Sequence, residues 1–133
     1  MADKHTQIQT QVILDWTASG RGRLYILQQG TFRYMYNDGC ITISPYPASK
    51  NSKKINGYPD LYGFEFIPYF YYDDHQFKEK PIPVYCLIEV KTKASPTITR
   101  KQMDHLDYCL SIDGKAYVAR ETDEGYSLVP WPC

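Results

Sequence analysis

The feature that most constrains the fold is an apolar strand pattern followed by a helix pattern and then a second strand pattern. Residues 84–92 alternate along the chain, so that the apolar Ile88 and the acidic Glu89 face opposite sides of a strand. Residues 99–110 place apolar side chains at helical spacing, and residues 115–120 predict another strand. A strand, a helix and a strand in this order predict a parallel strand pair joined by a right-handed crossover. We therefore expect an α/β fold.

The preceding part of the chain adds a helix and further strands. Apolar residues at helical spacing predict a helix over residues 6–17. Two β-rich runs follow at 23–28 and 31–36, and Gln29-Gly30 between them predicts a tight hairpin. A short strand at 40–44 and a mobile polar loop at 45–56 are expected next. They are followed by a long aromatic strand at 61–72 and a polar connection at 73–83. Within the aromatic strand, Pro68 marks an edge or a bulge. Together these elements predict a mixed β-sheet flanked by helices.

Size and composition exclude several classes of protein. A chain of 133 residues is long enough for one domain with a core, so residues 1–133 are expected to form a single domain. Fifteen basic and fifteen acidic residues give no net charge, which argues against a wholly electrostatic nucleic-acid binder. We find neither an apolar run that would span a membrane nor the apolar core of a secretory signal. The four cysteines lack zinc-ligand spacing, so we expect reduced thiols and a cytoplasmic location.

Three charged residues in two strands predict a chemical site. A hairpin that turns within residues 73–83 folds the strand at 61–72 back on the strand at 84–92, which places Asp60 near Glu89. Two carboxylates side by side repel each other, and a bound divalent cation is the usual remedy. Lys91 projects from the same face as Glu89 because strand side chains repeat every two residues. An ammonium there can position an attacking water or stabilise a pentacovalent phosphate.

These residues resemble the motif of the PD-(D/E)XK nuclease superfamily, as Pro59-Asp60 followed by Glu89-Val90-Lys91. More narrowly, the chain is similar to the VRR-NUC family, many of whose members are small phage proteins. The similarity covers residues 57–121. It is carried by Gly57-Tyr58-Pro59-Asp60-Leu61-Tyr62-Gly63, by Ile88-Glu89-Val90-Lys91-Thr92, by Arg100-Lys101-Gln102 on the next helix, and by the closing strand Gly114-Lys115-Ala116-Tyr117-Val118-Ala119.

The resemblance implies a restriction-endonuclease-like fold with an α-β-β-β-α-β core, and an endonuclease that hydrolyses DNA. Asp60, Glu89 and the Val90 carbonyl would then hold Mg²⁺ or Mn²⁺. Lys91 would orient the water, and Gln102 would support the lysine or a phosphate. The implied substrates are branched or Holliday-junction DNA. The alternatives are a nuclease acting on flaps or single-stranded ends, and a catalytically silent module that retains the fold for binding DNA or protein.

The first helix departs from the family pattern. Members usually carry an acidic residue there that supports the metal site, whereas this helix offers His5, Gln7, Gln9 and Gln11. Gln9 lies beside the apolar face of the helix, and we expect it to be the substitute. A neutral amide binds a cation more weakly than a carboxylate does, which argues against a second metal site.

Several of these residues also have plainer interpretations. Glu89 and Lys91 could form the solvated face of an edge strand. Thr99 and Gln102 have the spacing of a capping box, in which Gln102 bonds back to the start of its helix. This structural role does not exclude a catalytic one. On the same helix, His105 is expected to be structural, and Asp104 and Asp107 are expected to lie on a solvated face.

Basic residues gather in two stretches of the sequence, which favours a phosphate-bearing partner. The first stretch contains Arg21, Arg23, Arg33, Lys50, Lys53 and Lys54, and the second contains Lys91, Lys93, Arg100 and Lys101. We expect Lys50, Lys53, Lys54, Lys93, Arg100 and Lys101 to contact DNA. The aromatic run at 64–72 favours a core or a subunit interface over a surface for stacking bases. We therefore also expect a homodimer, whose two sites would face one DNA substrate.

Overall fold

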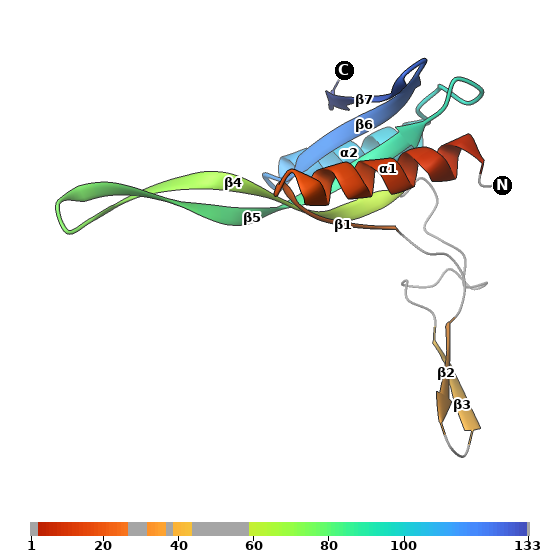
Figure 1. Ribbon diagram of the computed structural model, residues 1–133, viewed down its shortest axis with the longest axis horizontal. Helices are drawn as coiled ribbons and strands as arrows, with labels where there is room; N and C mark the ends of the chain where they lie inside the picture. Colours follow the sequence, from red (N-terminus) through yellow and green to blue (C-terminus); the bar gives the residue numbers. More distant parts are fainter. Residues whose placement is uncertain (1–2, 27–31, 37–38, 44–58, 133) are drawn as a thin grey trace.

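A mixed five-stranded sheet with a helix on each face forms the body of the protein (Figure 1). The structure is a computed structural model, and it describes residues 3–26, 32–36, 39–43 and 59–132. The strand order in the sheet is β1-β4-β5-β6-β7. The elements of the body are α1 (Lys4–Ala18), β1 (Gly22–Ile26), β4 (Leu61–Asp73), β5 (Gln76–Lys91), α2 (Arg100–Ser111), β6 (Lys115–Thr122) and β7 (Gly125–Pro130). Neither helix is long and apolar enough to cross a membrane, within the part of the chain that the structure describes.

Strand β5 is central and contributes to a core on each of its faces. Ile88 and Val90 pack beneath α1 with Val12 and Trp16 of that helix. Leu87 faces the other way and packs against α2. The predicted alternation of residues 84–92 is therefore confirmed, as is the parallel pairing of β5 with β6. Apolar side chains on both faces are typical of a central strand that is covered by a helix on each side.

The two helices lie close to their expected positions and begin at clear caps. The Asp3 side chain accepts a hydrogen bond from the Thr6 amide and caps α1, while Thr99 and Gln102 form the expected capping box of α2. The sequence pattern predicts a helix over residues 99–110, and α2 covers Arg100–Ser111. This helix ends where Asp113 adopts a positive φ of 64°.

The expected hairpin between residues 23–28 and 31–36 is wrong. Strand β1 pairs antiparallel with β4, whereas β2 (Phe32–Tyr36) pairs with β3 (Gly39–Ile43) in a separate two-stranded sheet. Gly22 and Gly63 allow β1 and β4 to approach closely. A Cβ atom at Gly22 would lie 2.1 Å from the Phe64 carbonyl oxygen, and one at Gly63 would lie 2.0 Å from the Arg23 carbonyl oxygen. This close pairing joins strands far apart in the sequence, so no local turn signal predicts it.

The prediction of a polar connection over residues 73–83 is also wrong, because β5 already begins at Gln76. Asp74 and His75 alone form the turn, with positive φ angles of 49° and 60°. Two consecutive residues of this kind are typical of a type I′ turn, which continues the twist of both strands. The resulting hairpin extends well beyond the sheet (Figure 1). Its strands are solvent-exposed there, which explains why their composition favours a loop.

Strand β7 is an element that the sequence interpretation missed. It pairs antiparallel with β6, from Thr122↔Gly125 to Tyr117↔Pro130. Its inward side chains include Leu128, which packs against the core beneath α1. The loop expected at 45–56 lies outside the described residues.

Candidate active site

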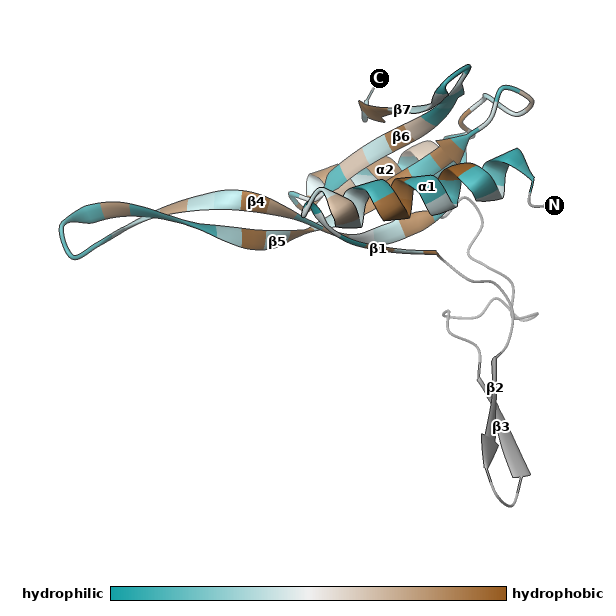
Figure 2. Ribbon diagram, viewed as in Figure 1, coloured by the Kyte–Doolittle hydropathy of each residue, from teal (hydrophilic) through white to brown (hydrophobic). Residues whose placement is uncertain are grey.

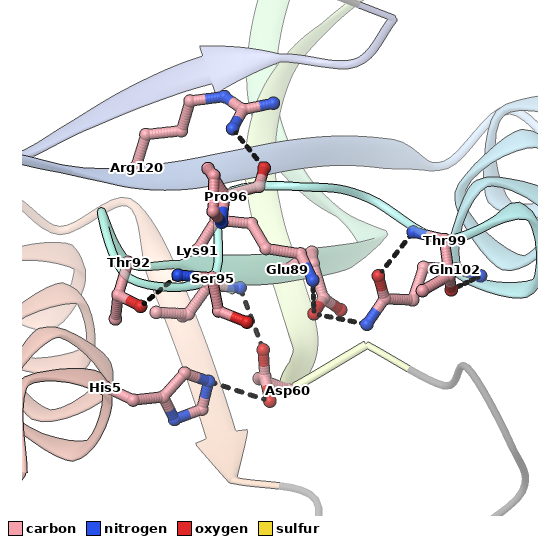
Figure 3. A network of polar contacts seen from close by, with 11 residues as sticks. His5, Asp60, Glu89, Lys91, Thr92, Ser95, Pro96, Thr99, Gln102 and Arg120 are labelled. Atoms are coloured by element: carbon pink, nitrogen blue, oxygen red, sulfur yellow. Dashed lines mark hydrogen bonds and ion pairs between the residues drawn. The ribbon is translucent and has the colours of Figure 1, made fainter.

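Asp60 lies at the start of β4, against the backbone of β5. The register pairs Leu61 with Ile88, so that Asp60 comes next to Glu89 and Val90. The Val90 amide donates a hydrogen bond of 2.9 Å to Asp60 Oδ2 (Figure 3). The amide and carbonyl of one residue in an antiparallel strand point to the same side. The Val90 carbonyl is therefore directed to the side on which Asp60 lies.

Glu89 and Lys91 form a buried ion pair on the α2 side of β5. Glu89 is 3% exposed and Lys91 is 9% exposed, and Lys91 Nζ lies 3.7 Å from Glu89 Oε1. The alternative of a solvated edge-strand face is thereby excluded, because β5 is a central strand and both side chains are buried. Burial of such a pair contributes little net stability, since desolvation offsets most of the attraction.

Gln102 joins this pair to the start of α2. Its side-chain nitrogen donates a hydrogen bond of 3.0 Å to Glu89 Oε1. Its side-chain oxygen accepts one of 2.9 Å from the Thr99 amide and thus completes the capping box. The amide group is therefore held at both ends, and the capping role coexists with the contact to Glu89. Figure 3 shows the resulting chain of contacts from α2 through Gln102 and Glu89 to Lys91.

The contact from α1 to the candidate site comes from His5, to which the sequence pattern assigns no role. His5 Nε2 lies 3.3 Å from Asp60 Oδ1. Gln9, the expected substitute for an acidic residue, is buried one turn further along α1. The i, i+4 spacing of His5 and Gln9 is the signal that points to His5, because it places both on the same side of the helix. Histidine bonded to a carboxylate is a common way to orient a metal ligand.

The oxygen donors suit a hard divalent cation. Asp60, Glu89 and the Val90 carbonyl supply two carboxylates and one main-chain oxygen, and Mg²⁺ and Mn²⁺ prefer oxygen ligands. Mg²⁺ usually keeps several water ligands and needs only one or two carboxylates from the protein. No group of three or more His, Cys, Asp or Glu side chains capable of holding a metal is found within the described ranges. The donor set thus fits a site that is completed by water and a phosphate, and not a closed structural site.

The expected DNA-contacting residues are placed unevenly. Lys50, Lys53 and Lys54 lie outside the described residues. Lys93, in the segment after β5, forms an ion pair with Asp123, and its amide donates a 2.9 Å hydrogen bond to Glu121 Oε1. Arg100 is exposed at the start of α2 and pairs with Asp104 at 3.2 Å, and Lys101 is exposed beside it. Of the residues expected to contact DNA, the exposed ones that the structure describes are therefore Lys93, Arg100 and Lys101.

Arg21, expected to contribute to a basic face, belongs to a partly buried polar cluster instead. This Arg21 cluster consists of Trp16, Arg21, Glu65 and Tyr117. Arg21 Nε donates to Glu65 Oε2 at 2.6 Å, and the Tyr117 hydroxyl donates to Glu65 Oε1 at 2.5 Å. The guanidinium also lies 4.3 Å from the centre of the Trp16 ring. Burial, together with the bond to Glu65, raises the pKa of Tyr117 to about 12.

The remaining polar residues of α2 have structural roles or exposed positions. Asp104 pairs with Arg100, and Asp107 accepts a hydrogen bond of 2.8 Å from Trp131 Nε1. Both aspartates are exposed, as expected for a solvated face. His105 is half-buried on the same helix. Cys109 is buried and reduced, as is Cys86 on β5.

Comparison of the chain with protein-family models and with curated proteins finds no match.

Proposed function

We propose that the chain is a divalent-metal-dependent endodeoxyribonuclease that hydrolyses phosphodiester bonds, with the restriction-endonuclease-like fold of the VRR-NUC family in the PD-(D/E)XK superfamily. The observation that carries the proposal is the convergence of Asp60, Glu89 and Lys91 at one end of the β4–β5 ladder. The order of elements supports it. Without the separate β2–β3 sheet, the chain runs α1, β1, β4, β5, α2, β6, which is an α-β-β-β-α-β order.

In this proposal the chain's own groups divide the work. Asp60, Glu89 and the Val90 carbonyl hold Mg²⁺ or Mn²⁺, while His5 and the Val90 amide orient Asp60 and Gln102 orients Glu89. When bound, the cation stabilises negative charge on the phosphate and lowers the pKa of a coordinated water. Lys91 carries three N–H donors and is held beside Glu89. It orients the attacking water or donates to a phosphate oxygen as negative charge develops there.

The Glu89–Lys91 pair favours an enzyme over a silent binding module. Removing two charges from water costs several kcal/mol per ion, and their mutual attraction offsets this cost only in part. A module that only binds DNA gains nothing from a buried pair next to a further carboxylate. The resemblance further suggests branched or junction DNA as substrate. A preference for flaps or single-stranded ends is the alternative.

Cleavage assays on site variants test the proposal. We expect Asp60→Asn and Glu89→Gln to abolish cleavage of a panel of labelled linear, flapped and four-way DNA substrates in Mg²⁺ or Mn²⁺. We expect Lys91→Ala to lose turnover and to keep metal and DNA binding, because its role lies in the transition state. Asp104→Asn is the matched control, since it removes an exposed carboxylate from α2 and should leave cleavage unchanged.

A second measurement does not depend on activity. A cation that binds only the folded state raises the free energy of unfolding by about 2.7 kcal/mol at a concentration 100 times its Kd. Mn²⁺ should therefore stabilise the wild-type protein and the Asp104→Asn control but not Asp60→Asn. Near-wild-type cleavage by Asp60→Asn or Glu89→Gln, or equal stabilisation of all variants by Mn²⁺, would contradict the assignment of the site.

A further inference from the structure

The β4–β5 hairpin continues as a two-stranded arm after its neighbours in the sheet have ended. Strand β1 pairs with β4 only as far as Glu65, and β6 pairs with β5 only from Cys86 onward. The arm comprises residues 66–73 and 76–83, which stay in register up to Asp73↔Gln76. A ribbon of two strands is marginally stable by itself in water and needs a covered apolar face. The arm therefore lacks a packing partner among the described residues.

Three prolines close the open edges of the arm. The Phe66 amide donates to the Arg21 carbonyl, which shows that even-numbered residues of β4 direct their backbone away from β5. Pro68 shares this orientation, and the register gives Pro81 and Pro83 the corresponding outward orientation on β5. Proline has no N–H, so each of them removes a donor from an open edge and none from the ladder between the strands. Prolines at these positions make the addition of a further strand less favourable. We therefore expect a partner of the arm to cover one of its faces.

The two faces of the arm differ sharply. The face that continues the α2 side of the sheet is apolar over its whole length, and Glu79 is its one charged side chain. Its most exposed aromatic residues are Phe77 at 82%, Phe70 at 65% and Tyr72 at 60%. Its aromatic and proline residues, with those at its base, are Phe64, Phe66, Pro68, Phe70, Tyr72, Phe77, Pro81, Pro83 and Tyr85. Figure 2 shows hydrophobic positions on both strands of this arm, outside the body of the protein.

The opposite face is mixed, with the half-buried pair Ile67 and Ile82 near its base and charged side chains toward the turn. Lys80 lies 5.8 Å from the centre of the Tyr69 ring and 5.5 Å from that of the Tyr71 ring, which keeps an ammonium over the two stacked rings. Lys78 on the same face pairs with Asp73 at 3.3 Å. An uncovered apolar face and a mixed face with charged side chains on the same ribbon indicate that a partner packs on one side only.

We propose that the apolar face of the arm packs against the same face of a second copy of this chain, related by a two-fold axis. An isologous interface brings the same surface of two copies together, so an apolar face can be covered by a copy of itself. Its five exposed aromatic side chains offer roughly 500–600 Å² per chain, so two copies bury about 1,100 Å². That area is near the lower limit for a specific dimer.

A nucleic acid fits the face poorly, because phosphate binding needs cations and this face carries one carboxylate and no Lys or Arg. The proposal goes beyond the nuclease assignment and does not depend on it.

Sedimentation velocity of the full chain over a micromolar concentration series tests this interface. We expect the wild-type protein to sediment as a dimer of the 15.5 kDa chain. Phe70→Ser and Phe77→Ser should each weaken the dimer by roughly 30-fold or more, the effect of truncating a central aromatic side chain. Tyr69→Ser is the matched control, because it alters an exposed aromatic residue of the same arm on the opposite face and should leave the dimer intact.

Circular dichroism establishes that each variant is folded, and Phe77 is so exposed near the turn that its replacement should not disturb the body. A monomeric wild-type protein would overturn the proposal. So would a dimer that neither Phe70→Ser nor Phe77→Ser weakens, or one that Tyr69→Ser weakens equally. Loss of affinity for single-stranded DNA in the phenylalanine variants, with no dimer in the wild type, would assign the face to nucleic acid instead.

Discussion

Replacing Glu89 by glutamine should lower the free energy of unfolding by about 3 kcal/mol in metal-free buffer. The side chain keeps its shape, and its amide oxygen can still accept the hydrogen bond from Gln102 Nε2. Only the negative charge is lost, which leaves the Lys91 ammonium buried without its counter-ion. At 3.7 Å and an effective dielectric constant of about 20, the gross attraction is about 4.5 kcal/mol. Removing one partner of a buried ion pair lowers the free energy of unfolding by about 3–5 kcal/mol. We take the lower value, because the Glu89–Lys91 pair lies at the end of the strand ladder.

The opposing effect is repulsion between Glu89 and Asp60. If that repulsion outweighed the attraction between Glu89 and Lys91, Glu89→Gln would stabilise the metal-free protein. We expect the attraction to prevail, because Asp60 is held by the Val90 amide and lies next to His5, whereas Lys91 is 3.7 Å from Glu89. The sign of the change in stability therefore decides between the two effects.

A double-mutant cycle in urea, followed by circular dichroism with a chelator present, measures the coupling. Lys91→Met keeps an apolar side chain of similar length and removes the charge. We expect the double variant to be more stable than the sum of the single changes indicates, by about 2–3 kcal/mol, because it leaves no buried charge unpaired. A loss below about 1 kcal/mol for Glu89→Gln, the range of a surface ion pair, would refute the buried-pair argument. An increase in stability would refute it as well.

Two further predictions concern the Arg21 cluster and the thiols of Cys86 and Cys109. Because the pKa of Tyr117 is raised from 10.0 to about 12 by burial and by its bond to Glu65, its neutral hydroxyl stabilises the fold below pH 10, and this contribution is lost as the pH rises to about 12. Urea midpoints measured from pH 9 to 12 should therefore fall less steeply for Tyr117→Phe than for the wild type, and parallel curves would contradict the prediction. Burial also raises the pKa of Cys86 and of Cys109, so both should resist iodoacetamide at pH 8 until urea unfolds the protein. Peptide mass mapping checks this, and native-state alkylation at either position would contradict it.

The elements that could be predicted from the sequence are those whose signal is local. The α2 helix carries its own cap at Thr99, and β5 carries alternation on two buried faces. A hairpin between those strands predicts that Asp60 lies near Glu89, but the register that brings them together depends on the turn at Asp74 and His75, which sequence interpretation placed within a longer connection. The contact between Gln102 and Glu89 follows from the position of Gln102 in the first turn of a helix that packs on that face.

The features that sequence interpretation missed depend on distant partners. Strand β1 joins β4 because Gly22 and Gly63 allow a close approach, and neither glycine signals this alone. The composition of the arm favours a loop because an exposed ribbon is not required to bury either face. His5 reaches Asp60 only because α1 packs across β5, and its i, i+4 spacing from Gln9 indicates a shared side of the helix but not the residue that it contacts.

Strand β5 links the two surfaces to which these proposals assign functions, and the Arg21 cluster separates them. Residues 86–91 of β5 lie within the sheet and carry the candidate site, whereas residues 76–83 form one strand of the arm. Between them, Glu65 holds the base of the arm to Arg21 after α1 and to Tyr117 of β6. Phe77 and Glu89 are about 40 Å apart along an extended strand, so a substitution on the arm cannot reach the candidate site by direct contact. We therefore expect an effect of an arm variant on cleavage to act through assembly, which allows catalysis and dimerisation to be separated in the same chain.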